Sequence, residues 1–319
     1  MKLSTVSSVY NEDENVKRAI QNLASQEIVP DEAVIVNDGS TDRTKEIIDK
    51  LKQKYKWLKV IHKEKNTGRQ VWFEGYKIAK GPIITVFDID TIPPKNWIKE
   101  IKSKFTKDVG LVGGLYVPAK SENLLENLQE IFIQLIIKVK NTWIYRLYRK
   151  KIDKNLLMAG TNTSFRKDFA EKLNILPRRL PYANDRRIQE GFRKSDYKIR
   201  FLKSIVKSRV PSSFKKFTSR WFRWGKAEPA RIGLKLNKLI LKLTQIAVIP
   251  ILLALAFIPA TALYFWMIAL ILLMSGGIVF YFVLGGRYDL FLIALSLILM
   301  AYAKIIHSLG YIHYFKTRK

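Results

Sequence analysis

Apolar residues in the first third of the chain recur in two alternating patterns, short continuous runs and longer amphipathic stretches. The short runs have the length of buried strands, and the amphipathic stretches place apolar residues three or four positions apart, as on one face of a helix. Short apolar strands joined by amphipathic helices predict a mainly parallel sheet covered on both faces, with ligands outside the carboxyl ends of the strands. The expected strands are 3–9, 33–37, 58–61 and 83–87, and the expected helices are 14–26, capped by Asp13, then 41–55 and 69–80.

The second half of the chain carries longer apolar stretches. Residues 122–148 have a helical pattern with a basic end, which fits either a core helix or a helix lying on a membrane surface. No charged residue occurs between Lys242 and Arg287, and a bilayer span needs about 20 apolar residues. We therefore expect membrane insertion of the segments 243–258, 262–284 and 290–306, the last of which carries Lys304 near its end.

These patterns divide the chain into three expected parts. They are an α/β domain over 1–213, a basic and aromatic juxtamembrane segment over 214–242, and a transmembrane domain of two to three spans over 243–319. Hydropathy favours three inserting segments. The positive-inside tendency instead favours a re-entrant or interfacial first segment, because two crossings then return the basic C-terminus to the cytoplasm.

The net charge of the chain indicates which kinds of molecule it can bind. Lys and Arg outnumber Asp and Glu 56 to 27, a formal net charge of +29, which indicates an anionic partner such as nucleic acid, phospholipid or a phosphorylated substrate. Basic residues concentrate between Arg186 and Lys242 among aromatic ones, as in nucleic-acid surfaces and in juxtamembrane segments. The apolar segments that follow favour the membrane, so membrane lipids are expected as partners and nucleic acid is not.

The rarer residue types exclude other kinds of site. The chain has no cysteine and three scattered histidines, so disulfides, thiolate metal sites and a zinc site are not expected. Residues 3–9 are too short and too polar for the apolar core of a signal peptide. We therefore expect a multi-pass protein of the cell membrane whose α/β domain lies in the cytoplasm.

Two aspartates follow the fourth expected strand. Asp88 and Asp90 are two positions apart, and residues i and i+2 of an extended chain point the same way. Two such carboxylates can share one divalent cation, because Mg²⁺ binds one or two carboxylates together with substrate phosphates. A solvated turn is the plainer interpretation of the pair alone, but its position after a buried strand favours a ligand site.

Polar residues also follow the first and second expected strands. These segments, 8–12 and 37–42, are expected to line one crevice with the aspartate pair. Asp38 can accept hydrogen bonds from a base or a ribose. Asp42 is better explained as a cap of the following helix.

Together these motifs resemble those of the family 2 glycosyltransferases, which have the GT-A fold. The matching pieces keep the family's order and spacing over residues 3–226, and the basic segment and apolar tail are similar to its membrane-bound branch, which builds polysaccharides or lipid-linked glycans. The pieces are Tyr10-Asn11-Glu12, residues 37–42, Asn66-x-Gly68 and Asp88-Ile89-Asp90.

The resemblance implies roles for individual residues. Tyr10, Glu12 and Asp38 would hold the nucleoside of a nucleotide sugar. Asp88 would lie near the ribose and the metal, and Asp90 would bind the metal, Mg²⁺ or Mn²⁺.

The family's general base is the Asp of a Glu-Asp pair, and the corresponding residues here are Asn184 and Asp185. A carboxylate at this position can take the proton of an attacking hydroxyl, so Asp185 is the candidate base. The alternative is a structural ion pair between Asp185 and Arg186 or Arg187. Residues 160–166 resemble the segment before the acceptor region, where small residues would let the backbone approach the sugar.

Membrane synthases of this family carry a Gln-x-x-Arg-Trp motif, which residues 220–224 match except for Arg in place of Gln. Arg223 would contact the donor diphosphate, and Trp224 would stack on the acceptor sugar. Anchoring at the membrane interface explains both residues equally well.

The sequence therefore predicts an inverting, metal-dependent glycosyltransferase of the hexosyltransferase type. It would move a sugar from a nucleoside-diphosphate sugar to a hydroxyl of a lipid-linked or glycan acceptor at the cytoplasmic membrane face. Two rivals stay open. One is transfer to a polyprenyl phosphate, whose nucleophile is already ionised and needs no base, and the other is a catalytically silent membrane scaffold.

Overall fold

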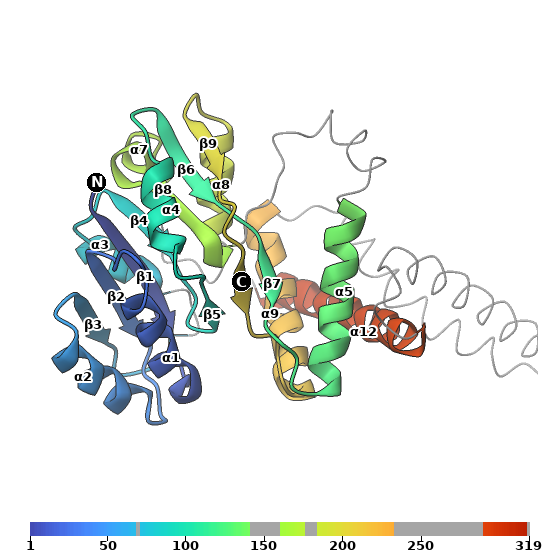
Figure 1. Cartoon of the computed structure of the whole chain (residues 1–319). Helices are drawn as coiled ribbons and strands as arrows, with labels where there is room; N and C mark the ends of the chain where they lie inside the picture. Colours follow the sequence, from blue (N-terminus) through green and yellow to red (C-terminus); the bar gives the residue numbers. More distant parts are fainter. Residues whose placement is uncertain (68–70, 141–159, 176–183, 233–289, 318–319) are drawn as a thin grey trace, which may run out of the picture. The chain divides into compact units, whose positions relative to one another are not determined.

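The computed structural model describes residues 1–67, 71–140, 160–175, 184–232 and 290–317. Within it the chain divides into two units (Figure 1). Met1–Ala119 and Lys154–Arg209 form the first unit, and Lys120–Asp153 and Val210–Lys319 form the second. The boundaries expected from the sequence, at 213 and 242, stay a prediction.

A seven-stranded sheet forms the centre of the first unit (Figure 1). Its order is β3-β2-β1-β4-β8-β6-β9, and neighbouring strands are parallel except where β8 takes part. The expected mainly parallel sheet is therefore confirmed. The seven strands are β1 (Leu3–Val9), β2 (Glu32–Asn37), β3 (Leu58–His62), β4 (Ile83–Val86), β6 (Val109–Gly113), β8 (Thr163–Arg166) and β9 (Lys198–Phe201).

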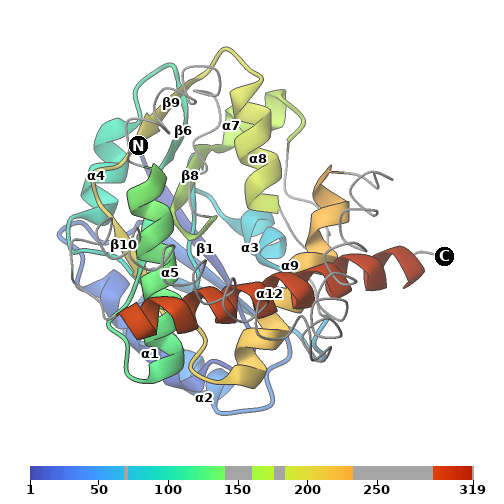
Figure 2. The same cartoon turned by 90° about the vertical axis from the view of Figure 1, so that its right-hand side faces the viewer.

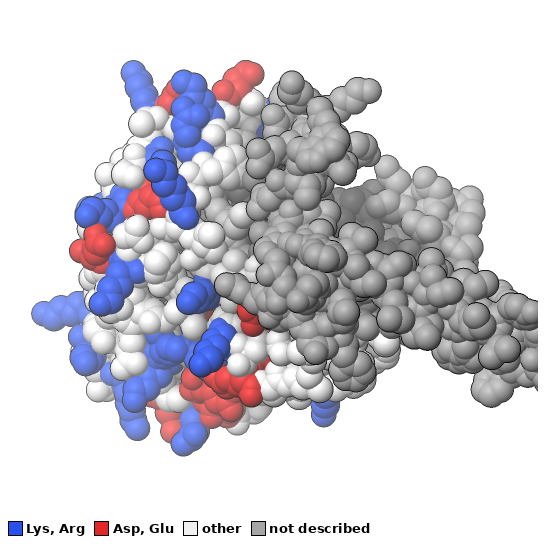
Figure 3. Space-filling model, turned by 45° about the vertical axis from the view of Figure 1, so that its right-hand side comes forward, with Lys and Arg blue, Asp and Glu red and all other residues white. Residues whose placement is uncertain are grey.

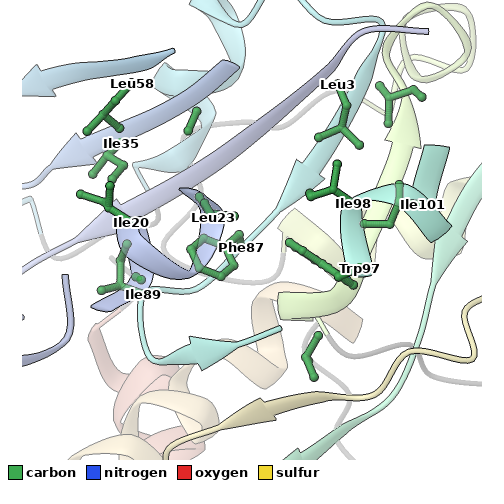
Figure 4. Packing of buried hydrophobic residues seen from close by; sticks show 14 of the residues in the cluster. Leu3, Ile20, Leu23, Ile35, Leu58, Phe87, Ile89, Trp97, Ile98 and Ile101 are labelled. Atoms are coloured by element: carbon green, nitrogen blue, oxygen red, sulfur yellow. The ribbon is translucent and has the colours of Figure 1, made fainter. Parts of the chain in front are cut away.

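Helices cover both faces of this sheet. Successive side chains of a strand point to opposite faces, so one strand can contribute to the apolar core on either side. Leu3 and Val9 of β1 belong to the core on the side of α1, α2 and α4, whereas Val6 belongs to the core on the side of α3, α7 and α8. Figure 4 shows the first of these cores, in which Ile20 of α1 and Trp97 of α4 pack against the strands. The helices of this unit are α1 (Asp13–Ala24), α2 (Thr44–Lys54), α3 (Trp72–Ile78), α4 (Trp97–Lys104), η1 (Gly160–Asn162), α7 (Lys167–Lys172) and α8 (Asn184–Arg193).

A second, three-stranded sheet of the first unit has the order β5-β10-β7. β10 runs antiparallel to β5 and parallel to β7. β5 directly follows the aspartate pair in the sequence. The pairing of β5 with β10 therefore fixes the backbone on the C-terminal side of that pair. Its strands are β5 (Thr91–Ile92), β7 (Tyr116–Pro118) and β10 (Val206–Ser208).

The expected elements agree with the structure except at some ends. The four strands expected from the sequence are found with ends that differ by at most one residue. Asp13 as the cap of α1 was wrong, because Glu12 occupies that position and its carbonyl accepts the Asn15 and Val16 N–H groups. α2 begins at Thr44 instead of 41, since the residues before it belong to a hydrogen-bonded loop described below.

The described part of the second unit consists of three helices, and α12 lies against both others (Figures 1 and 2). Leu128 of α5, Phe217 of α9 and Leu299 of α12 belong to one apolar cluster. Gly225 of α9 and Gly310 of α12 allow very close backbone contact, because a Cβ on either would lie about 2 Å from a carbonyl oxygen of the other helix. The helices are α5 (Leu124–Lys140), α9 (Phe214–Ile232) and α12 (Leu290–Thr317).

Among the described residues, one stretch is long and apolar enough to cross a bilayer, Leu295–His313 of α12. It overlaps the third membrane segment expected from the sequence, 290–306. The other two, 243–258 and 262–284, lie outside the described residues. The number of spans stays a prediction.

Positive charge is spread over the described surface. On the face drawn in Figure 3, Lys and Arg side chains are scattered over the described surface, with fewer acidic side chains among them. Exposed lysines such as Lys17, Lys45 and Lys77 lie on helices of the first unit, far in sequence from the basic stretch. The excess charge is therefore not confined to one basic patch.

Candidate active site

The carboxyl ends of neighbouring strands bring most of the expected site residues to one edge of the large sheet. β1 pairs with β2 on one side and β4 on the other, so the strand order reverses between β1 and β4. Ligands of open α/β sheets bind at such a switch point. The residues that follow these strands are Tyr10 and Glu12 after β1, Asp38 after β2, and Asp88 and Asp90 after β4.

The loops after β1 and β2 are tied together by hydrogen bonds. Asn11 has a φ of 53°, a left-handed conformation that Asn tolerates better than most residues. Its N–H donates to Ser40 Oγ over 3.0 Å, and its Oδ1 accepts the Thr41 N–H over 2.9 Å. The Glu12 N–H donates to Thr44 Oγ1 over 2.9 Å. The chain's own hydrogen bonds therefore fix the loop after β1.

Asp42 accepts hydrogen bonds from the first residue of two helices. Its Oδ1 accepts the Thr44 N–H over 3.0 Å at the start of α2, and its Oδ2 accepts the Asp13 N–H over 3.2 Å at the start of α1. Burial disfavours the ionised carboxyl, but hydrogen bonds from the Thr44 hydroxyl and these N–H groups outweigh burial and lower the pKa of Asp42. The N-cap position of α2 is Arg43, so the cap expected at Asp42 was wrong by one residue, although the Asp42 carboxylate binds the first N–H group of both helices.

The side chains of Tyr10 and Glu12 differ in how they are held. Tyr10 is 44% exposed, so its ring is open to a stacking partner. Glu12 is half-buried, and its Oε2 accepts from Asn15 Nδ2 over 2.6 Å. An aromatic face and a carboxylate therefore border the switch point on the β1 side.

Asp38 is only 4% exposed, and Thr67 holds its carboxylate. Thr67 donates its N–H over 3.1 Å and its hydroxyl over 3.0 Å. Gly39 has a φ of 70°, and a Cβ there would lie 2.5 Å from the carbonyl carbon of Lys65, so the turn requires glycine. Two motifs of the sequence, residues 37–42 and Asn66-x-Gly68, are therefore in contact here. Gly68 itself lies outside the described residues.

A further chain of hydrogen bonds extends from α2 to the same loops. Asp49 Oδ1 lies 2.9 Å from His62 Nε2, and His62 Nδ1 lies 3.1 Å from Asn37 Nδ2. An amide nitrogen only donates, so Nδ1 is the acceptor and Nε2 carries the hydrogen. The buried Asn37 uses its Oδ1 to accept from the Ser40 N–H over 3.1 Å and the Ser40 hydroxyl over 2.6 Å. His62 therefore fixes the amide orientation that holds Ser40.

Asp88, Ile89 and Asp90 form the turn between β4 and β5. Ile89 is buried in the core, whereas Asp88 is exposed and Asp90 half-buried, so both carboxylates lie outside the core as their spacing predicts. The Asp88 N–H donates to Thr161 Oγ1 over 3.2 Å, which anchors the turn. Among the residues that the structure describes, no three Asp, Glu, His or Cys side chains form a group suited to a metal ion.

Residues 160–166 lie beside this turn. Asn162 is fully buried, accepts from Trp97 Nε1 over 2.8 Å and donates to the Leu115 carbonyl over 3.1 Å. These contacts join η1 to α4 and to the loop after β6. The role that the resemblance gives this segment, close backbone approach to a sugar, stays a prediction.

Arg209 is a site residue that the sequence interpretation missed. β10 runs antiparallel to β5 with Ser208 opposite Thr91, and the Arg209 N–H donates to the Asp90 carbonyl over 3.2 Å. The next pair in this register is Arg209 with Asp90, and side chains of directly opposed residues lie on one face with Cβ atoms about 5 Å apart. The backbone of Arg209 therefore lies next to that of the candidate metal ligand, with the two side chains on the same face. No sequence pattern links two positions so far apart in the chain.

Asp185 lies in the first turn of α8, and its side chain is outside the described residues. One turn later, Gln189 Nε2 donates over 2.9 Å to Thr163 Oγ1, and Thr163 pairs with the last residues of β4 and β6. Phe192 packs on Gly110, near the start of β6. α8 therefore runs back from the carboxyl ends of the strands, which places the backbone of Asp185 at the same sheet edge as the aspartate turn.

Arg223 and Trp224 belong to the second unit, on α9. Both are exposed, and the Trp224 ring lies edge-on to Trp221 with 5.2 Å between the ring centroids. Their expected contacts with a diphosphate and an acceptor sugar stay predictions.

Comparison with known families decides the identity of the first unit. The family model described as Glycosyl transferase family 2 matches residues 4–173, more than half of the chain. The chain belongs to this family.

Several relatives are named as glycosyltransferases. The probable glycosyltransferase YdaM of Bacillus subtilis is 25% identical over 238 residues, which cover 70% of this chain and 54% of YdaM. The dolichol-phosphate mannosyltransferase of Pyrococcus furiosus is 30% identical over 164 residues, covering 50% of this chain and 40% of the relative. A prophage bactoprenol glucosyl transferase homolog of Escherichia coli is 26% identical over 190 residues, 56% of each chain. The chain thus spans about half the length of these relatives.

A solved mannosyltransferase structure is also similar over nearly the whole chain. The mannosyltransferase PcManGT of Pyrobaculum calidifontis, solved with GDP-Man and Mn²⁺, matches 98% of this chain and 87% of its own with a TM-score of 0.61 and 16% identity. At this low identity the match shows only that the two folds are similar. The GT-A-like α/β fold expected from the motifs is confirmed.

Proposed function

We propose that this family 2 protein transfers a sugar from a nucleoside-diphosphate sugar to a hydroxyl of a lipid-linked or glycan acceptor, with inversion at the anomeric carbon. One observation carries the proposal: three features meet at one edge of the sheet. They are the fixed loops after β1 and β2, the aspartate turn with Arg209 beside it, and the start of α8 with Asp185.

The fixed loops are proposed to bind the donor nucleoside. Tyr10 offers a ring to the base, and the carboxylates of Glu12 and Asp38 accept hydrogen bonds from base or ribose. Thr67 already uses part of the hydrogen-bonding capacity of Asp38, which leaves room for one or two further donors. GDP-Man in the PcManGT structure supports a nucleotide sugar as the ligand of this fold.

The aspartate turn fits a divalent cation. Asp90 and Asp88 would hold Mg²⁺ or Mn²⁺ through carboxylate oxygens, the donors these ions prefer, and phosphate oxygens and water would complete the shell. The Mn²⁺ in the PcManGT structure supports this use of the fold. When bound, such an ion supplies positive charge that stabilises a departing diphosphate.

Arg209 and Arg223 are proposed to neutralise the same diphosphate. A guanidinium group can donate two parallel hydrogen bonds to phosphate oxygens. Arg209 is opposite Asp90 in the small sheet, so its charge is available on the leaving-group side of the site. Arg223 would add a second contact from α9, and Trp224 would stack on the acceptor sugar.

Asp185 is proposed as the general base. The acceptor oxygen forms a bond to the anomeric carbon while the bond from that carbon to the phosphate oxygen breaks. The diphosphate leaves with the bonding electron pair, and the acceptor proton moves to Asp185. One displacement from the face opposite the leaving group inverts the configuration.

The acceptor is proposed to be membrane-bound. Basic and aromatic residues of α9 precede two apolar segments of the sequence, so we propose attachment to the cytoplasmic face of the cell membrane by a multi-pass tail. A polyprenyl phosphate is the second candidate acceptor, because two relatives are named for dolichol-phosphate and bactoprenol transfer.

A donor screen on the detergent-solubilised full chain tests the proposal. UDP- and GDP-sugars are offered with Mn²⁺ or Mg²⁺, with and without membrane lipid extract, and released nucleoside diphosphate is recorded. We expect release from one donor class that needs the metal and is stimulated by lipid. If no donor binds and none releases nucleoside diphosphate, a catalytically silent membrane scaffold explains the protein better than a glycosyltransferase does.

The hydrogen-bond chain through His62 gives a prediction for donor binding. The His62→Phe variant is expected to bind UDP or GDP about three- to tenfold more weakly, which corresponds to one net hydrogen bond. The ring is kept, but Asn37 loses the acceptor that orients its amide, so Ser40 and its loop are held less firmly. Isothermal titration calorimetry measures the change.

His62→Gln is the matched variant, because its side-chain oxygen can replace Nδ1 as an acceptor for Asn37. We expect it to restore most of the affinity. Equal weakening by Phe and Gln, or no weakening by either, would contradict a positioning role for His62.

A further inference from the structure

The apolar stretch Leu295–His313 of α12 has the length of a membrane span, but its charges do not fit one. Lys304 is exposed and lies at the middle of this stretch, nine residues from either end. A crossing helix would place its ammonium group about 15 Å from either interface, beyond the reach of a lysine side chain. Each Lys or Arg at the bilayer centre disfavours insertion by roughly two orders of magnitude.

α9 accompanies the second half of the same stretch. The hydroxyl groups of Thr218 and Tyr302 lie 3.1 Å apart, and further along the backbones touch at Gly225 and Gly310. α9 must therefore lie at the depth of α12. Its exposed cations would enter the hydrocarbon with it, and they are Lys215, Lys216 and Arg223.

The part of α12 before Lys304 is too short to cross alone. Leu290 to Ala303 is fourteen residues, about 21 Å of helix against a hydrocarbon core of about 30 Å. This part packs on α5, where Ser296 Oγ donates to the Leu128 carbonyl over 2.8 Å. α12 is therefore accompanied by other helices from Leu292 to His313.

One face of α12 is nevertheless apolar and turned away from α5 and α9. Its residues follow one another at intervals of three or four, which places them on one side of a helix. Ile298 is 54% and Leu309 41% exposed, whereas Met300 and Ala303 on the opposite side are buried in the helix cluster. The stripe consists of Ile298, Ala301, Ile305, Leu309 and Ile312.

We propose that α12 lies along the membrane surface and does not cross it. The apolar stripe contacts acyl chains at the interface, Lys304 reaches the headgroups, and the cations of α9 face anionic lipid. The uncharged run between Lys242 and Arg287 is long enough for two crossings of about 20 residues each, which would return α12 to the side of α5 and α9. This also keeps the basic C-terminus in the cytoplasm, as the positive-inside tendency favours.

Single-cysteine labelling tests this position, because the natural chain has no cysteine. The variants are Lys304→Cys, Ile298→Cys and Leu309→Cys, with Lys50→Cys on the exposed side of α2 as the reference. Each full-length variant is labelled with a membrane-impermeant maleimide in sealed vesicles that expose the cytoplasmic face. No donor is needed, so the outcome is independent of the proposed glycosyl transfer.

Lys304→Cys is expected to react within about threefold of Lys50→Cys, whereas Ile298→Cys and Leu309→Cys react at least about tenfold more slowly, because acyl chains exclude the reagent. A Lys304→Cys variant that stays unlabelled until detergent is added would overturn the proposal, since a crossing helix gives that result. Stripe cysteines that react as fast as Lys304→Cys would overturn it too. Elution of each variant like the natural chain in detergent confirms that it folds.

Discussion

The Asp90→Asn variant is expected to release nucleoside diphosphate from its donor about a thousandfold more slowly than the natural chain. Asparagine keeps the size and one oxygen of the side chain but removes the negative charge that would hold a divalent cation against the diphosphate. The change also leaves Arg209 opposite a neutral side chain. Initial rates at saturating donor, measured over a range of Mn²⁺ concentrations, give both the rate and the apparent metal affinity.

Asp196→Asn is the matched control. It makes the same chemical change at an exposed carboxylate in the turn before β9. We expect its rate to stay within about twofold of the natural chain, because exposed charges contribute little. If Asp90→Asn kept the natural rate and the natural Mn²⁺ dependence, the aspartate turn would not be the metal site.

The Asp185→Asn variant is expected to lose about 100- to 10,000-fold in transfer to a hydroxyl acceptor, the range that general-base catalysis contributes. Its affinity for UDP or GDP should stay within about twofold, because Asp185 acts on the acceptor and not on the nucleotide. Transfer rates with lipid extract and calorimetric titration of the nucleotide measure the two quantities separately.

The choice of acceptor decides the size of this effect. An ionised phosphate acceptor has no proton to lose, so with purified polyprenyl phosphate the same variant should keep its rate within about threefold. A large loss with hydroxyl acceptors supports inversion by base catalysis. A rate unchanged with every acceptor would assign Asp185 to a structural pair with a neighbouring arginine.

The sequence predicted β1, β2 and β4 because these strands are buried on both faces. β2, for example, reads as a nearly continuous apolar run, and such runs stand out against amphipathic helices. β9 was not predicted, because its residues are mostly exposed and its sequence, Lys-Ile-Arg-Phe, has no apolar run. The two-residue β5 has no periodicity at all.

Some features of the candidate site were also predicted from the sequence, whereas others were not. Motifs that directly follow strands, such as Asp88 and Asp90, were found because a strand end fixes where the next residues lie. The hydrogen bonds through Asn11 and His62 depend on side-chain directions that no spacing rule gives. Arg209 was missed because only the register of β10 against β5 places it beside Asp90. The position of Asp185 came from family resemblance alone.

The place of β8 in the sheet has a consequence for synthesis on the ribosome. β8 is the strand that joins β4 to β6, yet it leaves the ribosome only after β6, β7 and all of α5. Until then β6 has neither of its neighbours, since β9 is made later still. A nascent chain that ends after Ala119 therefore exposes the edge of β4 and an unpaired β6, which we expect to require chaperone protection. A fragment that contains both sheets of the first unit must accordingly extend to Arg209.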